Sequence, residues 1–140
     1  MQNIKNSSIL ITGGGSGIGK GTAKYLAKKG SKVTICGRRE EKLVEVAQEI
    51  GDACCYVSAD ITTQTGREKV IEYALHHGKG LNALINNAGN AHGFDNSAEA
   101  DLDDWDLMID TNLKGLLYVT KAVLPKMIAK REGHIINVGS

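Results

Sequence analysis

Short runs of β-branched and apolar residues alternate along the chain with segments in which apolar residues recur at helical spacing. The runs predict five strands, at Ser8–Thr12, Lys32–Cys36, Cys54–Ser58, Ala83–Asn86 and His134–Val138. Strands and helices alternating in this way are typical of βαβ units, which build a parallel sheet covered by helices on both faces. We therefore predict an α/β fold, a Rossmann-like doubly wound parallel sheet, as one domain over residues 1–140.

The helical periodicity lies between these strands. One amphipathic helix covers 43–50, and Gly51 is placed to end it. A second is predicted around 70–75, and a longer apolar pattern runs from Trp105 to Ile128. Pro125 lies inside this last pattern, where the missing backbone N–H is expected to kink the helix.

Composition changes this picture little but excludes several classes of protein. Hydrophobic residues make up 41% and charged residues 24% of the 140 residues, as in ordinary folded domains. The formal net charge of +1 provides no field that would attract nucleic acid or an anionic membrane. No apolar run approaches the roughly 20 residues of a membrane span. The three cysteines form no metal-ligand spacing and are expected to be reduced thiols, so we expect a cytoplasmic protein without a metal site.

Candidate chemistry begins at the turn between the first strand and the first helix. Its residues are Gly13, Gly14, Gly15, Ser16, Gly17, Ile18 and Gly19. Glycine permits positive φ and lets a ligand approach the backbone, while the following helix directs unpaired N–H groups at the same place. The turn therefore predicts a site for the pyrophosphate of a nucleotide.

Two common nucleotide motifs do not fit this turn. The Rossmann spacing G-x-G-x-x-G matches in no register. A P-loop fits from Gly14 to Lys20 but then requires a Ser or Thr to bind magnesium, and the chain has Gly21 there. A P-loop nucleoside triphosphatase is thus disfavoured.

The spacing that does fit is T-G-x-x-x-G-x-G, carried by Thr12, Gly13, Gly17 and Gly19. It resembles the short-chain dehydrogenase/reductase family of the classical type, and the segment 86–89, Asn-Asn-Ala-Gly, matches a second motif of that family. The resemblance implies an oxidoreductase that binds a nicotinamide dinucleotide. It covers all 140 residues but only about the first half of a family member, with five strands of an expected seven.

The end of the second strand indicates which dinucleotide is bound. NAD-binding folds place an acidic residue there on the ribose 2′-hydroxyl, whereas this chain has Gly37, Arg38 and Arg39. A guanidinium in place of a carboxylate favours the 2′-phosphate of NADP over NAD. By resemblance Arg38 is expected to be the main contact, and Arg39 either a second contact or a solvated surface charge.

The resemblance implies further cofactor-binding residues. Asp60 and Ile61 match the pair that lies around the adenine ring, although Asp60 could also cap the next helix. In relatives the first asparagine of the Asn-Asn-Ala-Gly motif supports the central sheet, and the second, here Asn87, lies against the cofactor ribose. Ala88 and Gly89 complete this candidate set.

Two residues are candidates for catalysis. Asn112 is polar within the apolar pattern of the long helix, where it is costly unless paired, and it resembles the asparagine that holds a water on the family's proton relay. Ser140 aligns with the serine that hydrogen-bonds the substrate. The family's Tyr-x-x-x-Lys pair, expected about a dozen residues further on, is not within these residues. We therefore expect the 140-residue polypeptide alone to show no turnover.

The segments 37–43 and 105–140 are most similar to NADP-dependent 3-hydroxy acid dehydrogenases that oxidise serine or allo-threonine. The 3-oxoacyl-carrier-protein reductases share most of these motifs. The resemblance implies a small-molecule substrate and, for a complete member, a homo-oligomer. A non-catalytic nucleotide-binding module is the alternative, although such a module would need neither Asn112 nor Ser140.

Overall fold

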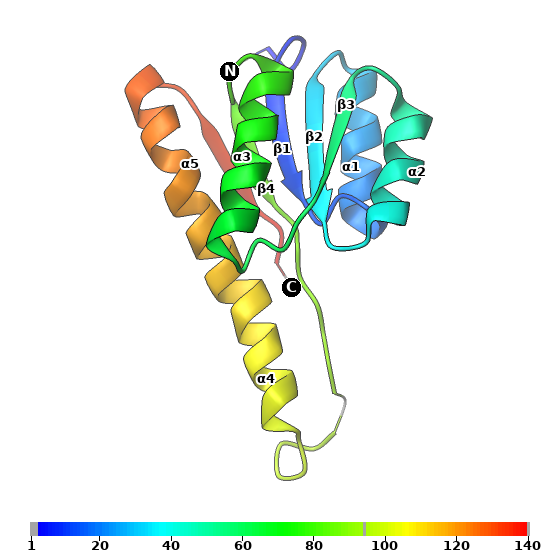
Figure 1. The fold of residues 1–140 in the computed structure, drawn as a ribbon, viewed down its shortest axis with the longest axis vertical. Helices are drawn as coiled ribbons and strands as arrows, with labels where there is room; N and C mark the ends of the chain where they lie inside the picture. Colours follow the sequence, from blue (N-terminus) through cyan, green and yellow to red (C-terminus); the bar gives the residue numbers. More distant parts are fainter. Residues whose placement is uncertain (1–2, 94, 140) are drawn as a thin grey trace.

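The computed structural model describes residues 3–93 and 95–139 and shows a single parallel sheet between two layers of helices (Figure 1). The elements in chain order are β1 (Ser8–Thr12), α1 (Gly17–Lys28), β2 (Lys32–Gly37), α2 (Glu40–Ile50), β3 (Cys54–Ser58), α3 (Gln64–Gly78), β4 (Ala83–Asn86), α4 (Leu102–Ile109), the π-helix η1 (Asp110–Gly115), α5 (Leu116–Lys130) and β5 (His134–Asn137). All five predicted strands are present, and their ends agree with the prediction to within one residue.

The strand order is β3-β2-β1-β4-β5, and every neighbouring pair is parallel. The chain moves outward from β1 to β3, then returns to the other side of β1 for β4 and β5. This reversal between β1 and β4 is the point where ligands bind in doubly wound sheets. The predicted fold class is confirmed.

Strand β1 is central and is buried along its whole length. Ile9 and Ile11 face the helices α1 and α2, where they pack with Val33, Ile35 and other buried side chains. Leu10 points to the opposite face and packs under α3 and α5. Because both faces are covered, the strand is apolar at consecutive positions and does not alternate.

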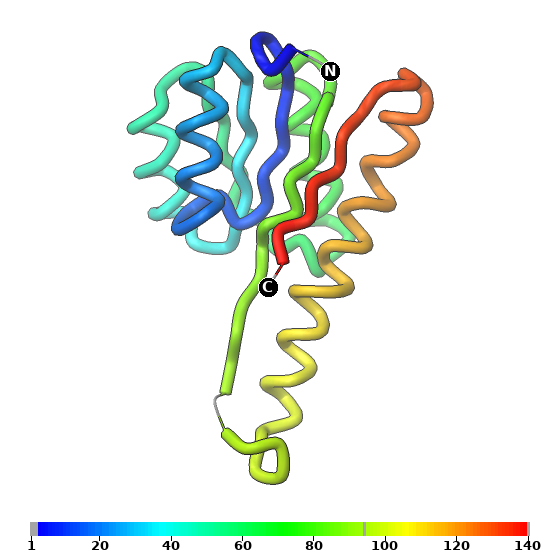
Figure 2. Tube along the Cα trace, turned by 180° about the vertical axis from the view of Figure 1, so that it is seen from behind, coloured from blue at the N-terminus to red at the C-terminus, as the bar shows by residue number. Residues whose placement is uncertain are grey.

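The segment from α4 through η1 to α5 forms one long helical rod, half of which extends beyond the sheet (Figures 1 and 2). The α-helix α5 continues through Pro125, and the change in helix geometry lies earlier, in the six residues of η1. Pro125, where a kink was predicted, is therefore not where the helix is irregular. The irregular segment is η1, which contains Asn112, and π-helical turns often accompany functional residues.

The rod is also where apolar side chains are most exposed. Ile109 and Leu113 are 45% and 58% exposed, so the apolar pattern predicted for this helix is not covered by other described residues. On β5, Ile136 is exposed as well. None of the helices in the described part of the chain is both long and apolar enough to cross a membrane.

Candidate cofactor site

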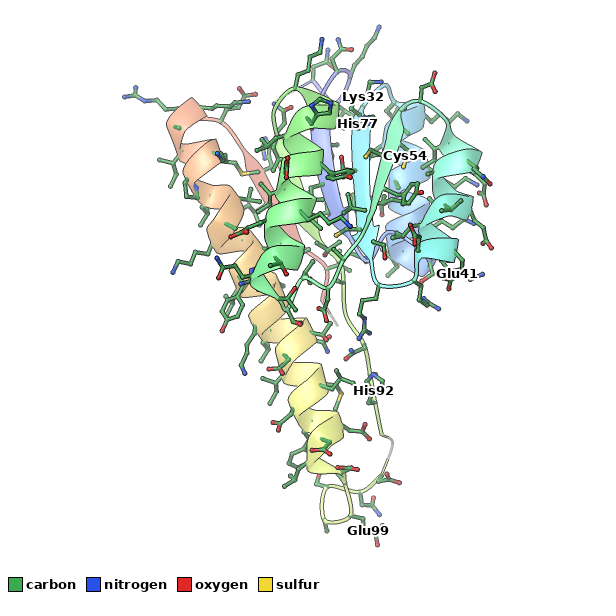
Figure 3. The ribbon with its side chains drawn as sticks, viewed as in Figure 1. Lys32, Glu41, Cys54, His77, His92 and Glu99 are labelled. Carbon is green, nitrogen blue, oxygen red and sulfur yellow. The ribbon has the colours of Figure 1, made fainter. Side chains whose placement is uncertain are left out.

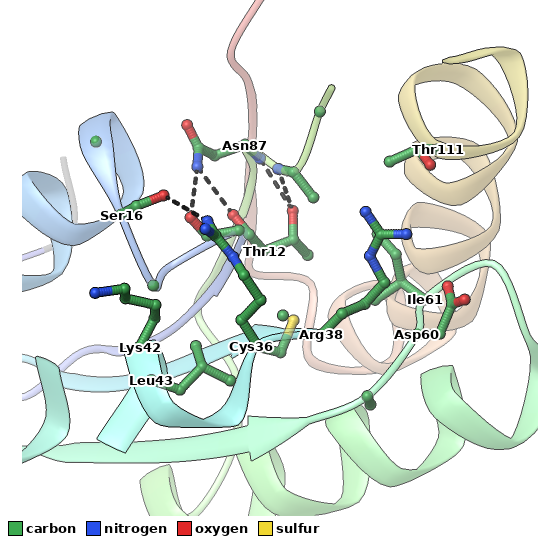
Figure 4. Close-up of a pocket in the computed structure, with 18 of the residues that line it drawn as sticks. Thr12, Ser16, Cys36, Arg38, Lys42, Leu43, Asp60, Ile61, Asn87 and Thr111 are labelled. Carbon is green, nitrogen blue, oxygen red and sulfur yellow. Dashed lines mark hydrogen bonds between the residues drawn. The ribbon is translucent and has the colours of Figure 1, made fainter. Parts of the chain in front are cut away.

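A cavity of about 570 Å³ opens at the carboxyl edge of the sheet, between the glycine-rich turn and the ends of β2, β3 and β4 (Figure 4). This volume is in the range of small-molecule sites. Its walls contain most of the predicted cofactor residues, namely Gly13, Gly15, Ser16, Gly17, Ile18, Arg38, Arg39, Asp60, Ile61, Asn87, Ala88 and Gly89. Gly14 and Gly19 lie behind this wall, where they pack the turn onto the sheet and onto itself.

The turn needs glycine for two separate reasons. Gly13 has φ +67°, and a Cβ there would lie 2.8 Å from the Ala88 Cα. A Cβ on Gly19 would collide with the Gly13 carbonyl oxygen and with Asn87. The turn therefore packs tightly against the end of β4 and directs the start of α1 at the cavity. The Ser16 hydroxyl at the N-cap makes no capping hydrogen bond, so it does not occupy the helix N–H groups.

The glycine-rich turn and the end of β4 are joined by Thr12 and Asn87. The Thr12 hydroxyl accepts hydrogen bonds from the backbone N–H groups of Asn87 and Ala88, at 3.0 and 2.9 Å. In return, Asn87 Nδ2 donates to the carbonyl oxygens of Thr12 and Gly13, both at 3.1 Å (Figure 4). These four bonds fix the glycine-rich turn after β1 against the segment 86–89 at the end of β4.

Asn86 lies one residue earlier, buried at the end of β4. Its Nδ2 donates to Thr120 Oγ1 on α5 and to Asn137 Oδ1 on β5, both at 2.9 Å. It therefore ties β4 to its neighbouring strand and to the helix above. This arrangement agrees with the sheet-supporting role that the family resemblance implied for the first asparagine.

Arg38 and Arg39 follow β2 and extend to different parts of the cavity. Arg39 Nη2 donates to Ser16 Oγ at 3.4 Å, so this guanidinium lies beside the glycine-rich turn. Figure 4 shows Arg38 extending the other way, toward Ile61 and Thr111. Gly37, at the position that carries the acidic residue in NAD-binding folds, has no side chain to repel a phosphate.

Asp60 follows β3 and turns its carboxylate back onto its own loop. Asp60 Oδ1 accepts hydrogen bonds from the backbone N–H and the hydroxyl of Thr62, at 2.9 and 2.7 Å. Partial burial raises the pKa of Asp60, but these two bonds and the Arg38 charge outweigh it and hold the pKa below its usual value. The cap of α3 is Thr63, which accepts from the Gly66 N–H, so the alternative of Asp60 as the cap is wrong.

Asn112 lies in η1, and both ends of its side-chain amide are hydrogen-bonded. Its Oδ1 accepts from the Asn90 backbone N–H and its Nδ2 donates to the Asn90 carbonyl, both at 2.8 Å. Asn90 Nδ2 donates in addition to Thr111 Oγ1 at 3.2 Å. Thr111 lines the cavity, whereas Asn112 does not. The pair therefore attaches the loop after β4 to the long helical rod.

The structure does not test the second catalytic candidate, because Ser140 lies outside the described residues. The strand that leads to it is in place, since β5 pairs with β4 and brings Asn137 opposite Asn86. Among residues 3–93 and 95–139, no three His, Cys, Asp or Glu side chains are grouped so that they could hold a metal ion.

The cavity also contains residues that the sequence did not mark as cofactor contacts, although Thr12 and Gly37 belong to the motifs described above. They are Thr12, Cys36, Gly37, Lys42, Leu43, Ala59, Thr62 and Thr111. Cys36 is fully buried at the end of β2, and burial raises the pKa of its thiol to about 12 despite a hydrogen bond with the Gly13 backbone. Lys42 is a charged residue on an amphipathic helix, and such a residue gives no sequence signal that separates it from solvated surface.

The fold agrees with comparisons to known proteins. Residues 7–140 match the short chain dehydrogenase family. The chain is 39% identical over 132 residues to the NADP-dependent 3-hydroxy acid dehydrogenase YdfG of Shigella flexneri, covering 94% of this chain and 53% of that protein. The chain thus spans about half the length of the curated relatives it matches.

Two solved structures are similar throughout the described fold. The closed form of a serine dehydrogenase complexed with NADP⁺ superposes with a TM-score of 0.89 at 39% identity, covering 94% of this chain and 53% of that one. A 3-ketoacyl-(acyl-carrier-protein) reductase from Brucella melitensis complexed with NADH has a TM-score of 0.93 at 35% identity, covering 98% and 58%. The chain belongs to the short-chain dehydrogenase family of oxidoreductases.

Proposed function

We propose that this chain forms the NADP(H)-binding part of an oxidoreductase. The observation that carries the proposal is the cavity itself. One wall is the glycine-rich turn with the start of α1, and the other carries Arg38 and Arg39 beside Gly37, where a carboxylate would select NAD. A site built in this way fits a dinucleotide that bears a 2′-phosphate.

Each part of the cofactor has a counterpart in the cavity. The pyrophosphate fits the turn at 13–19, because the backbone there is open and the N-terminus of α1 favours negative charge. The adenine fits near Asp60 and the apolar Ile61, and the nicotinamide ribose fits along 87–89. The tight packing of Gly13 and Gly19 supports the fit, because a side chain at either position would force the turn out of place.

For the complete protein we propose hydride transfer between NADP and a hydroxy or keto substrate, such as a 3-hydroxy acid or a 3-oxoacyl thioester. When bound, the nicotinamide accepts or supplies the hydride. Asn112 would hold the proton-relay water and Ser140 would orient the substrate oxygen. The similarity to a 3-hydroxy acid dehydrogenase and to a serine dehydrogenase supports the first substrate class. The 140 residues alone contain no Tyr-x-x-x-Lys after β5, so this polypeptide should bind cofactor without turning over substrate.

Hydrogen exchange with and without NADPH tests where the cofactor binds. We expect added NADPH to slow amide exchange at 13–19 and at 87–89. The groove between α2, β3 and α3, which contains Gln48 and Tyr73, is the internal control and should be unchanged. Protection at that groove with none at the glycine-rich turn would contradict the proposal. Reduction of a keto acid by the purified 140-residue polypeptide would contradict the expected lack of turnover.

A further inference from the structure

Lys42 lies against the glycine-rich turn although it comes from a different element. It is in the first turn of α2 and lines the same cavity as the turn. A Cβ on Gly15 would lie 3.2 Å from the Lys42 Cβ, so the base of the lysine packs against the turn. Figure 4 shows its ammonium group on the side of the cavity where Ser16 lies.

Charged side chains lie at both ends of the cavity. At one end Arg39 reaches Ser16, at 3.4 Å, and Lys42 lies beside the same turn. At the other end Arg38 lies close enough to Asp60 for its charge to act on that carboxyl group. The first end thus has two cations, Arg39 on the Ser16 hydroxyl and Lys42 in an exposed pair with Glu45, whereas at the second end Arg38 acts on the Asp60 carboxylate.

We propose that Lys42 is a specificity-determining residue of this site, and that it holds the 2′-phosphate of the cofactor together with Arg39 and the Ser16 hydroxyl. Arg38 then covers the adenine side, next to Asp60. The inference rests on the proposed binding of NADP(H). It departs from the expectation that Arg38 is the main phosphate contact.

The charges support this division. A phosphate monoester carries close to two negative charges near neutral pH, and is therefore best held by more than one cation. Lys42 Nζ lies 3.4 Å from Glu45 Oε2, in a pair whose side chains are 45% and 57% exposed. Such exposed pairs are weak, so a phosphate can displace Glu45 at little cost. Glu40 and Glu41 are the acidic residues in the first turn of α2 (Figure 3 labels Glu41), and neither lines the cavity.

The test is the dissociation constant for NADPH and for NADH, measured by calorimetry on the whole chain. Lys42→Met should weaken NADPH binding by about three- to tenfold, as expected for one partly exposed charge-assisted contact, and leave NADH binding unchanged. Lys42→Arg should restore the preference. Glu45→Gln should bind NADPH as tightly as the wild type or more tightly, since it releases the lysine. Lys28→Met, an exposed lysine of α1 outside the cavity, is the matched control.

Three results would overturn the inference. Equal weakening of both cofactors by Lys42→Met would show that the lysine acts through the fold and not on the phosphate. An unchanged NADPH constant in that variant would show that Lys42 does not contact the phosphate, while the proposed function would stand. If the folded wild type bound neither cofactor, the proposed function would fail together with the inference.

Discussion

The Asn112 side chain is bound at both ends to the backbone of Asn90, through two hydrogen bonds of 2.8 Å. One side-chain amide thus pairs with the backbone of the loop after β4, much as a neighbouring strand would, and joins that loop to the π-helix η1. Because that loop begins at the Asn86–Gly89 motif, the pair controls where the cofactor-facing backbone lies relative to the long helical rod.

Replacing Asn112 by Ala should therefore loosen this loop. The Asn90 N–H and carbonyl would lose their partners, which is expected to lower the free energy of unfolding by about 1–3 kcal/mol. Denaturant unfolding measures the loss, and hydrogen exchange should speed up at the Asn90 amide. Leu113→Ala, at a neighbouring exposed position, should change stability by less than about 0.5 kcal/mol. Equal effects of the two substitutions would contradict this account of Asn112.

Two glycines of α1, two residues apart, should respond oppositely to alanine. A Cβ on Gly19 collides with the Gly13 carbonyl oxygen, so Gly19→Ala should destabilise the fold by about 2–4 kcal/mol. Gly21 has open space around its Cβ position, so Gly21→Ala should stabilise the helix by about 0.5–1 kcal/mol. Thermal unfolding of the two variants decides the matter, and a stable Gly19→Ala protein would show that the turn is not packed as described.

Glu49 on α2 joins the first two helices and should make stability depend on pH. Hydrogen bonds from Lys20 and Lys24, at 2.8 and 2.7 Å, lower the pKa of Glu49 from 4.5 to about 2. Since the folded-state pKa lies below the ordinary value, the ionised group stabilises the fold above about pH 4.5, and this contribution is lost as the pH falls toward 2.

The measurement is the melting temperature of wild type and Glu49→Gln between pH 7 and pH 2. The wild type should be the more stable at neutral pH, and the two curves should converge in acid. Added salt should reduce the difference, because the groups are exposed. Glu72→Gln, an exposed residue of α3, is the control. A difference that persists at pH 2 would mean that the ion pairs are not its source.

The Cys36 thiol should resist modification in the folded protein. Burial raises its pKa to about 12, so almost no thiolate is present at pH 8, and the side chain is fully covered. Peptide mapping after iodoacetamide treatment should find Cys36 unmodified in the native protein and fully modified in urea. If Cys36 reacted in the native protein as fast as in urea, its thiol would be open to the cavity, contrary to this account.

Much of this organisation was predictable because it follows from local chemistry. The five strands are apolar runs bounded by turn residues, and glycines at this spacing before a helix are typical of a phosphate-binding turn. Asn87 and Arg38 could be identified because they stand at the ends of strands, which meet at one edge of a parallel sheet. Their positions along the chain therefore indicated their positions in space.

The remaining features depend on contacts between distant segments. Lys42 occupies a polar position of an amphipathic helix, and only the packing of Gly15 against α2 brings it to the cavity. The π-helix at 110–115 reflects a shift in backbone hydrogen bonds at the place where Asn112 binds the Asn90 loop. The spacing of apolar side chains along the sequence does not indicate such a shift. Pro125 was the visible irregularity in the sequence, yet the α-helix accommodates it.

The most direct test of the central claim is a titration of the purified, folded chain with NADPH and separately with NADH, followed by nicotinamide fluorescence. The claim predicts saturable binding of both cofactors, with NADPH the tighter. Gly13→Ala, which forces a side chain at φ +67° against Ala88, should remove that binding. The claim would be contradicted if the folded chain showed no saturable binding of NADPH at millimolar concentration. Tighter binding of NADH than of NADPH would also contradict it.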